Sequence, residues 1–296
     1  MNAWFPIVAL AMVGLIAGVA QLLGFLPLPG DAFGDWNSPP GTYELGIYVY
    51  SPVLTQLLEP LRWANALPVF IVVLSVINFA SISYIFGRWA ILVLLLFFPA
   101  ALIPGAWWTE PITIVLIGNV TMPMLAALIA GLRQPGWLAV PLLTKIGPGV
   151  IGFLWLAFRR EWRALRTGLL LTCVIVVVFA VLDPGAWLEY VRFALANAGS
   201  STDGPAIVGP PLAIRFPLAV VLVAVAARFN QPRLVPLAAA VATIGLYGWG
   251  TFFSVAVGAL SPRLASNRDR PSGSLPGDRS ASDEGGEATL VPLPEP

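Results

Sequence analysis

The fold of this chain is decided by residues 137–158, which read WLAVPLLTKIGPGVIGFLWLAF. Lys145 stands in the middle of this apolar run and is the only lysine in the chain. A charge at membrane depth costs about 2.5–3.5 kcal/mol on insertion scales, so such residues usually face a cavity or a partner. Gly147, Pro148 and Gly149 follow at once and predict a break in the helix. We therefore expect a positive charge held at a bent backbone, where it can meet an anion.

The composition around this stretch is typical of a protein that crosses a membrane several times. Of the 296 residues, 58% are hydrophobic and only 10% are charged, whereas a soluble domain carries about 25% charged residues. The chain also holds 28 glycines and 28 prolines, which membrane helices tolerate where neighbours or wet cavities satisfy the freed backbone groups. The prediction is an all-α, polytopic membrane protein, a helical bundle with broken and hairpin helices.

Missing residue types exclude several functions. Histidine is absent, which rules out Ser-His-Asp hydrolysis, HExxH metalloproteases and histidine metal sites. Cys173 is the only cysteine, so no internal disulfide and no cysteine-based metal cluster can form. The glycine-rich motifs of nucleotide-binding domains do not occur either. We expect no cofactor, no metal site and no nucleic-acid partner.

Apolar runs divide the chain into one membrane domain and a polar tail. The tail, residues 261–296, is rich in Ser, Pro, Gly and charged residues, cannot bury a core and is expected to be disordered. Residues 1–260 form the predicted transmembrane domain, and its first run is read as a retained span because it lacks a basic leader. Besides 137–158, the apolar runs lie at about 3–28, 67–86, 89–106, 112–132, 167–182, 211–228 and 234–260.

Charges in the loops predict the topology. Acidic residues dominate the loops 29–52, 107–111 and 183–210, which the positive-inside rule places outside the cell. The loops that carry most of the arginines contain Glu161 as their one acid, so they are predicted to be cytoplasmic. Their basic residues are Arg88, Arg133, Arg159, Arg160, Arg163, Arg166, Arg228 and Arg233.

This topology requires residues 137–158 to turn back, because Arg133 and Arg159 fall on the same side. We expect a hairpin made of half-helices 137–145 and 150–158, with the break at 147–149, which brings Lys145 to the floor of a cavity open to the outside. A similar break is expected at 245–250 in the final run. Helices at the membrane interface are expected over 52–63 and from Asp183 onward.

Four further residues are candidates for chemistry or binding. Asp31 and Asp35, in the first outer loop, are either general bases at the rim of the cavity or parts of a solvated loop. Arg215, at the outer start of a span, either binds a phosphate together with Lys145 or extends to lipid headgroups. Asn119 either presents an amide to the cavity or makes an interhelical hydrogen bond. Residues 159–166 are expected to bind anionic headgroups.

Several short motifs, in this order and spacing, resemble glycosyltransferase family 87, which is also catalogued as domain of unknown function 2029. The resemblance covers about residues 30 to 260, and its members are GT-C type membrane enzymes. The motifs are Tyr48-Val49-Tyr50-Ser51-Pro52, Gly118-Asn119, Thr144-Lys145-Ile146-Gly147-Pro148-Gly149, Arg159-Arg160-Glu161-Trp162-Arg163 and Ile214-Arg215-Phe216-Pro217.

The resemblance implies a mannosyltransferase that uses polyprenyl-phosphate mannose at the outer face of the plasma membrane. A hexose would pass from this lipid carrier to a glycolipid or glycan acceptor. In the family the first outer loop carries a catalytic aspartate; Asp31 matches it, and Asp35 replaces a nearby tyrosine. Lys145 and Arg215 match the family's basic positions. Tyr50 and Asn119 are assigned to substrate binding.

Two departures from the family leave alternatives open. This chain is shorter than typical members, and its first outer loop is compressed between the aspartate and the Tyr-Ser-Pro element. The general base is therefore either Asp31 or Asp35, and an inactive paralogue is an alternative. A transporter or flippase for a lipid-linked anion is another, because broken helices with a charge at membrane depth also mark transporters.

Overall fold

The helices of this protein are seen in a computed structural model, which describes residues 5–26, 36, 50–94, 119–197, 212–243 and 255–265. Within these ranges there are eleven α-helices and no β-strand, which confirms the all-α prediction. Three helical stretches are long and apolar enough to cross a membrane: α1 (Phe5–Leu22), Leu67–Leu94, which begins with α4 (Leu67–Phe86), and α10 (Trp162–Leu182). The chain is a helical membrane protein.

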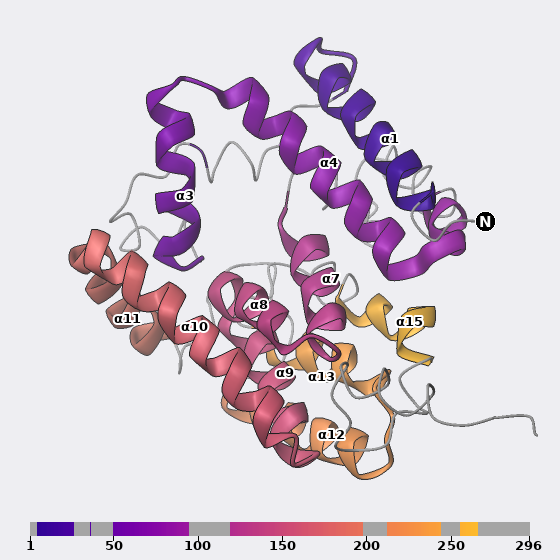
Figure 1. The fold of residues 1–296 in the computed structure, drawn as a ribbon, viewed down its shortest axis with the longest axis vertical. Helices are drawn as coiled ribbons and strands as arrows, with labels where there is room; N and C mark the ends of the chain where they lie inside the picture. The colour runs from indigo at the N-terminus through magenta and orange to yellow at the C-terminus, as the bar shows by residue number, and fades with distance from the viewer. Residues whose placement is uncertain are drawn as a thin grey trace, which may run out of the picture.

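Helices α1 and α4 form an antiparallel pair at one side of the molecule (Figure 1). Gly14 and Gly18 let the two backbones approach, since a β-carbon on Gly14 would lie 2.7 Å from the Ser75 carbonyl oxygen and one on Gly18 would lie 2.9 Å from the Val72 Cα. Ser75 also donates a 3.3 Å hydrogen bond to Gln21. Small residues four apart are a common way to pack membrane helices closely.

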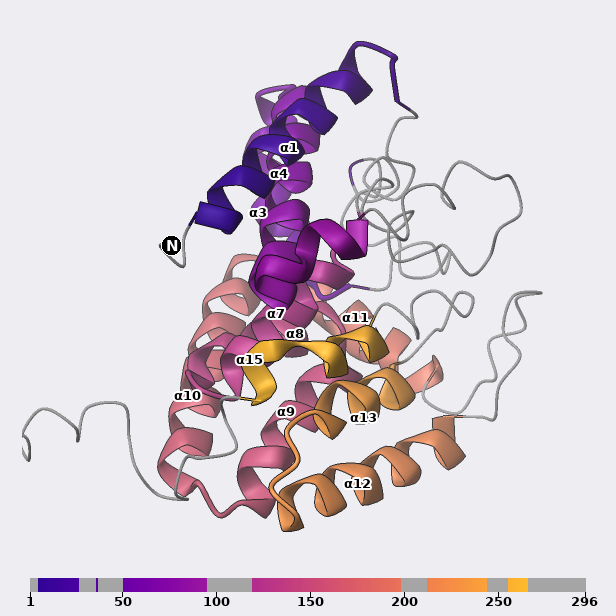
Figure 2. The same cartoon turned by 90° about the vertical axis from the view of Figure 1, so that its right-hand side faces the viewer.

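Most of the later helices pack on one another and share one core with the α1–α4 pair (Figures 1 and 2). Their shared core is built from fully buried aliphatic side chains on successive helices, among them Leu128, Ile151, Val223 and Val235. The elements are α7 (Thr121–Gly131), η4 (Pro135–Leu138), α8 (Ala139–Thr144), α9 (Ile146–Phe158), α10, α12 (Leu212–Arg228) and α13 (Leu234–Ala242).

Helices α8 and α9 form the predicted hairpin, but the chain breaks at Lys145 rather than at 147–149. Lys145 has extended backbone angles, φ −138° and ψ 114°. On its two sides the chain doubles back, because a β-carbon on Gly152 would lie 2.6 Å from the Leu138 side chain and one on Gly149 would overlap the Leu142 backbone.

The predicted position of the break is wrong for a physical reason. Pro148 is the third residue of α9, and a proline in the first helical turn loses no intrahelical hydrogen bond because those N–H groups have no partner there. Gly147 and Gly149 are needed for close approach to other helices, not for bending.

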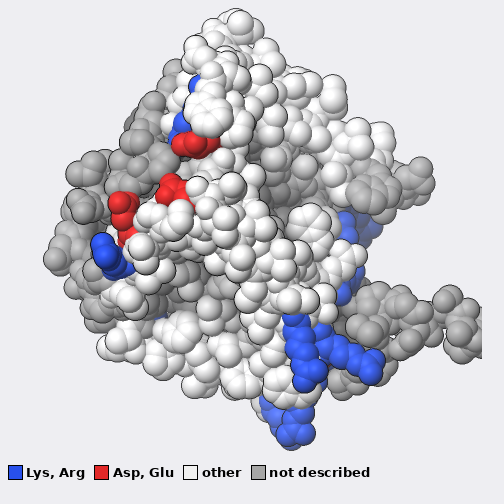
Figure 3. All heavy atoms as spheres, turned by 60° about the vertical axis from the view of Figure 1, so that its left-hand side comes forward, with Lys and Arg blue, Asp and Glu red and all other residues white. Residues whose placement is uncertain are grey.

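Two ends of the structure correspond to the two classes of loop. Pro135 lies against Gly168, in the second turn of α10, where a β-carbon on the glycine would be 2.8 Å from the proline carbonyl oxygen. Arg133 and Arg159 therefore flank the same end, as the hairpin requires. We name this the arginine end and the opposite end, with Lys145, Asp183 and Arg215, the Lys145 end. Figure 3 shows acidic side chains gathered at one edge and most basic ones at the other.

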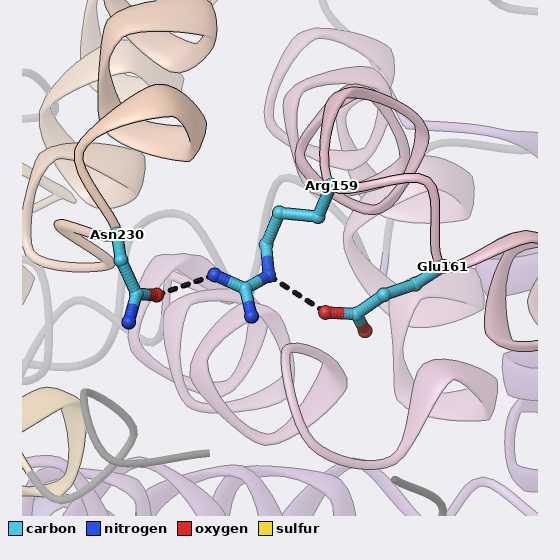
Figure 4. A network of polar contacts seen from close by, with 3 residues as sticks. All are labelled: Arg159, Glu161 and Asn230. Carbon is cyan, nitrogen blue, oxygen red and sulfur yellow. Dashed lines mark hydrogen bonds and ion pairs between the residues drawn. The ribbon is translucent and has the colours of Figure 1, made fainter. Parts of the chain in front are cut away.

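The arginine end is closed by a polar network (Figure 4). Arg159 forms a 2.6 Å ion pair with Glu161 and donates a hydrogen bond to Asn230, in the turn between α12 and α13. Asn230 has a positive φ of 49°, a conformation that asparagine adopts more readily than most residues. The network joins the α9–α10 corner to the α12–α13 corner.

The predicted boundary of the polar tail at residue 261 is too early. Helix α15 (Pro262–Ala265) packs on α4: Leu264 is buried, Ser261 donates to the Ile85 carbonyl, and Arg263 donates to the Tyr84 carbonyl. The guanidinium of Arg263 also lies 4.0 Å from the centre of the Tyr84 ring. These contacts fix residues that composition alone assigns to the tail. The break predicted at 245–250 and residues 266–296 lie outside the described residues.

Both short helices predicted near the membrane interface are present at the Lys145 end. Helix α3 (Pro52–Trp63) has the predicted bounds, with Pro52 at its first position, where proline is favoured. Helix α11 (Pro184–Asn197) begins after Asp183, whose carboxylate accepts a 3.0 Å hydrogen bond from the Ala186 N–H. This is the role of an N-cap residue. Helix α3 packs against both α10 and α11.

Candidate functional site

Lys145 occupies the turn of the hairpin and lies against an aromatic ring. Its backbone N–H donates a 2.8 Å hydrogen bond to the Pro141 carbonyl, which closes α8. Its Nζ lies 5.8 Å from the centre of the Tyr50 ring, within the range of a cation–π interaction. The side chain is half-buried. The structure thus brings together two of the residues predicted for the site, Lys145 and Tyr50.

Tyr50 belongs to a small aromatic cluster built by four separate segments. Its ring is only 5% exposed and shares the cluster with Tyr190 of α11. Ile146, Val120 and Trp187 pack against this pair, so the hairpin turn, the start of α7 and α11 all meet at Tyr50. Burial raises the pKa of Tyr190 to about 12. Its hydroxyl therefore stays protonated at neutral pH.

Asn119 lies beside this cluster but caps its own helix. Its side-chain oxygen accepts hydrogen bonds from the Thr121 N–H at 2.9 Å and from the Thr121 hydroxyl at 2.5 Å. The residue is 8% exposed. These two bonds order the first turn of α7. The contact of Asn119 with substrate stays a prediction. In the structure its side-chain oxygen is bonded to Thr121 at the start of α7.

Arg215 reaches the same end of the hairpin through α13. Arg215 lies near the start of α12. Its guanidinium donates a 3.0 Å hydrogen bond to the carbonyl of Thr243, the residue directly after α13. A cation is favourable at the carboxyl end of a helix. Gly147 packs directly against Ala242, the last residue of α13. Lys145 and Arg215 thus flank a single junction, where α9 begins and α13 ends.

The junction brings two cations to the amino end of α9, beside the carboxyl end of α13 with its partial negative charge. The first N–H groups of α9 have no partner within the helix, and the amino end of a helix carries a partial positive charge. Lys145 and Arg215 add two full charges beside it. This arrangement favours an anion such as a phosphate.

The predicted bases lie outside the described residues, so the distance from Asp31 or Asp35 to Lys145 stays a prediction. Their neighbour Trp36 is described and is held at the Lys145 end. Its ring stacks on Phe70 at a centroid distance of 5.6 Å, and its carbonyl accepts a 2.9 Å hydrogen bond from Arg62 of α3.

Sequence reasoning missed a group of polar side chains on α3 and α11. Ser51, Trp187 and Glu189 each have a buried polar atom without a hydrogen-bond partner in the described part of the chain. The sequence predicts only an interfacial helix from Asp183 onward at this place. No sequence pattern distinguishes a polar side chain that has a partner from one that lacks it, because the partner comes from another segment.

Neither a metal site in the described residues nor a related protein was found. Among the described residues no group of three or more His, Cys, Asp or Glu side chains has the arrangement of a metal site. The chain matches no protein-family model, no curated protein and no solved structure. The likeness to glycosyltransferase family 87 therefore stays a resemblance carried by the short motifs quoted above.

Proposed function

We propose that this protein transfers a hexose, most simply mannose, from a polyprenyl phosphate carrier to a glycolipid or glycan acceptor. The observation that carries the proposal is the position of Lys145 at the turn of the α8–α9 hairpin, with Arg215 at the adjoining junction. Two cations and a helix amino terminus form a site suited to a phosphate group. A lipid-phosphate donor needs no nucleotide-binding fold, in keeping with the absence of glycine-rich motifs.

The proposed reaction is a direct displacement at the anomeric carbon. The carboxylate of Asp31 or Asp35 takes the proton of an acceptor hydroxyl, whose oxygen forms a bond to that carbon. The bond from the carbon to the phosphate oxygen breaks, and polyprenyl phosphate leaves with the electron pair. The anomeric configuration inverts. Lys145 and Arg215 stabilise the negative charge that grows on the departing phosphate.

The proposed location is the plasma membrane, which the chain crosses several times. The arginine end would face the cytoplasm under the positive-inside rule. Arg160, Arg163 and Arg166 would bind anionic headgroups there. The Lys145 end would then face outward, where α3 and α11 would lie in the membrane interface.

One observation favours a second function, transport of a lipid-linked anion. Helix α13 ends at Ala242 against the first turn of α9, so the end of one helix and the start of another meet at the cationic junction. Transporters commonly bind substrates at helix ends inside the membrane. A carrier would move the lipid without breaking the bond to the sugar, which separates the two functions experimentally.

A transfer assay tests the proposal. Membranes containing the full chain are supplied with polyprenyl phosphate carrying labelled mannose, and the label is followed from carrier to product. We expect transfer by the wild type and its loss in Asp31→Asn or Asp35→Asn, whichever supplies the base. Arg163→Ala, a charge removal on an exposed side chain at the arginine end, is the control.

Each of the other results decides between the alternatives. Movement of the labelled lipid across the membrane without transfer would support transport. Full activity in both aspartate variants would refute the assignment of the base. Membranes that show neither transfer nor movement would refute both functions.

A further inference from the structure

Buried polar atoms without partners gather on α3 and α11. In the described part of the chain four such atoms are Ser51 Oγ, Gln56 Oε1, Trp187 Nε1 and Glu189 Oε2, and others lie on α4, at Asn78 and Ser83. Folded proteins bury few such atoms, because each loses its hydrogen bonds to water. Four of them on two neighbouring helices indicate that something outside the described chain completes their bonding.

Ser51 shows this most clearly. It is the N-cap residue of α3 and is 1% exposed, yet its hydroxyl makes no capping hydrogen bond. A serine at this position normally accepts a bond from an N–H of the first helical turn. The hydroxyl is therefore buried without the capping hydrogen bond that a serine at this position normally makes.

Two of the four atoms, those of Ser51 and Trp187, lie beside the site already described. Ser51 follows Tyr50, whose ring contacts Lys145, and Trp187 packs in the same aromatic cluster, with its ring 6.1 Å from Tyr190 in an edge-on arrangement. Gln56 is anchored beside α11 through a 3.2 Å hydrogen bond from its Nε2 to the Phe179 carbonyl near the end of α10. Figure 1 shows α3 next to the ends of α10 and α11.

The chemistry of these atoms selects the ligand. Gln56 and Glu189 offer acceptors, Trp187 offers a donor, and the Ser51 hydroxyl can act as either. A phosphate presents acceptors and would be repelled by Glu189, and a lipid chain would satisfy none of the four. Sugar hydroxyls both donate and accept, and the apolar body of Trp187 suits the less polar face of a sugar ring.

We propose that the contact between α3 and α11 beside the Tyr50 ring, with Ser51 and Trp187 as its polar groups, binds the sugar headgroup of the acceptor. The identification of the bound sugar as the acceptor rests on the proposed glycosyl transfer. The sugar site itself does not depend on it. The phosphate of the donor and the hydroxyls of the acceptor would then occupy opposite sides of the Tyr50 ring.

Binding of octyl α-mannoside to the full chain in lipid nanodiscs tests this sugar site. Ser51→Ala removes one polar atom and keeps the packing, whereas Trp187→Phe removes the N–H and part of a packed ring. Each should raise the Kd about tenfold, as the loss of a hydrogen bond to a buried group predicts. Ser51→Ala should not lower the melting temperature of the ligand-free protein, because the removed atom has no partner there; Trp187→Phe should lower it, because the smaller ring leaves a cavity. Trp162→Phe and Ser81→Ala are matched controls; Trp162 is exposed, and the Ser81 hydroxyl bonds within α4 to Ile77.

The results separate this inference from the proposed function. Absent binding by the wild type, or a Kd that is the same in the variants and controls, overturns the sugar site even if transfer occurs. A lower melting temperature of Ser51→Ala with an unchanged Kd also overturns it and assigns the atoms to bound water. Weaker binding in both variants, in a protein that transfers no sugar, supports the sugar site and refutes only the enzymatic function.

Discussion

Gly147 lies so close to Ala242 that a β-carbon on the glycine would overlap the alanine carbonyl. The amino end of α9 and the carboxyl end of α13 therefore meet backbone to backbone. Lys145 precedes this contact by two residues, and Arg215 binds the carbonyl of the residue after Ala242. This contact is one of several between α9, α12 and α13 that set the relative position of the two cations.

Gly147→Ala should separate the two helices and move Lys145 relative to Arg215. We expect the free energy of unfolding to fall by about 1–3 kcal/mol, as for other overpacked sites, and the KM for the lipid donor to rise. Thermal unfolding in detergent and donor kinetics in membranes measure the two effects. Gly136→Ala is the matched control, because its β-carbon would approach only the end of the Leu171 side chain, at 3.0 Å. Equal effects of the two substitutions would show that the junction does not position Lys145.

Gly18→Leu should detach α1 from α4. The larger side chain has no space beside Val72, so we expect destabilisation by about 1–3 kcal/mol and faster proteolysis after α1. The control is Ile16→Leu on the same helix, where the side chain is 66% exposed. If Gly18→Leu unfolds at the same temperature as Ile16→Leu, close packing of α1 on α4 is not what holds this pair together.

Arg159 and Asn230 should be energetically coupled. A double-mutant cycle with Arg159→Ala and Asn230→Ala should give a coupling energy of about 0.5–1.5 kcal/mol, the range for one hydrogen bond in a partly buried site. Urea or thermal unfolding of the four proteins provides the values. The cycle Arg163→Ala with Asn230→Ala is the control, since Arg163 is exposed. Additive effects of Arg159→Ala and Asn230→Ala would show that the hydrogen bond of Figure 4 does not stabilise the protein.

A truncation after Ala265 should be more stable than one after Leu260. Both proteins lack residues 266–296, so the difference reports the buried Leu264 and the contacts of Ser261 and Arg263 with α4. We expect a gap of at least about 2 kcal/mol, since burial of a leucine alone contributes about that much. Identical melting temperatures would place the boundary of the folded domain at 260, as composition predicts.

The hairpin and α3 could be predicted because their signals are local or follow from charge. Arg133 and Arg159 must lie on one side of the membrane, and this requires residues 137–158 to turn back whatever their detailed packing. Pro52 fixes the start of α3 because proline fits the first position of a helix.

The position of the break and the end of the domain could not be predicted in the same way. Gly147 and Gly149 read locally as breakers, but they serve contacts with Ala242 and Leu142. Ser261 and Arg263 read as parts of a polar tail, but α4 presents backbone carbonyls that bind them. Both errors arise where a partner distant in sequence decides the role of a residue. The same holds for the unpartnered atoms of Ser51 and Trp187.

The most direct test of the cationic site is the affinity of the full chain for polyprenyl phosphate in lipid nanodiscs. Lys145→Ala should raise the Kd at least about tenfold, the loss expected for one charge-assisted hydrogen bond, while Arg233→Ala, at an exposed arginine outside residues 159–166, should leave it unchanged. A Kd for Lys145→Ala equal to that of the wild type would contradict the role of this lysine as the phosphate-binding group.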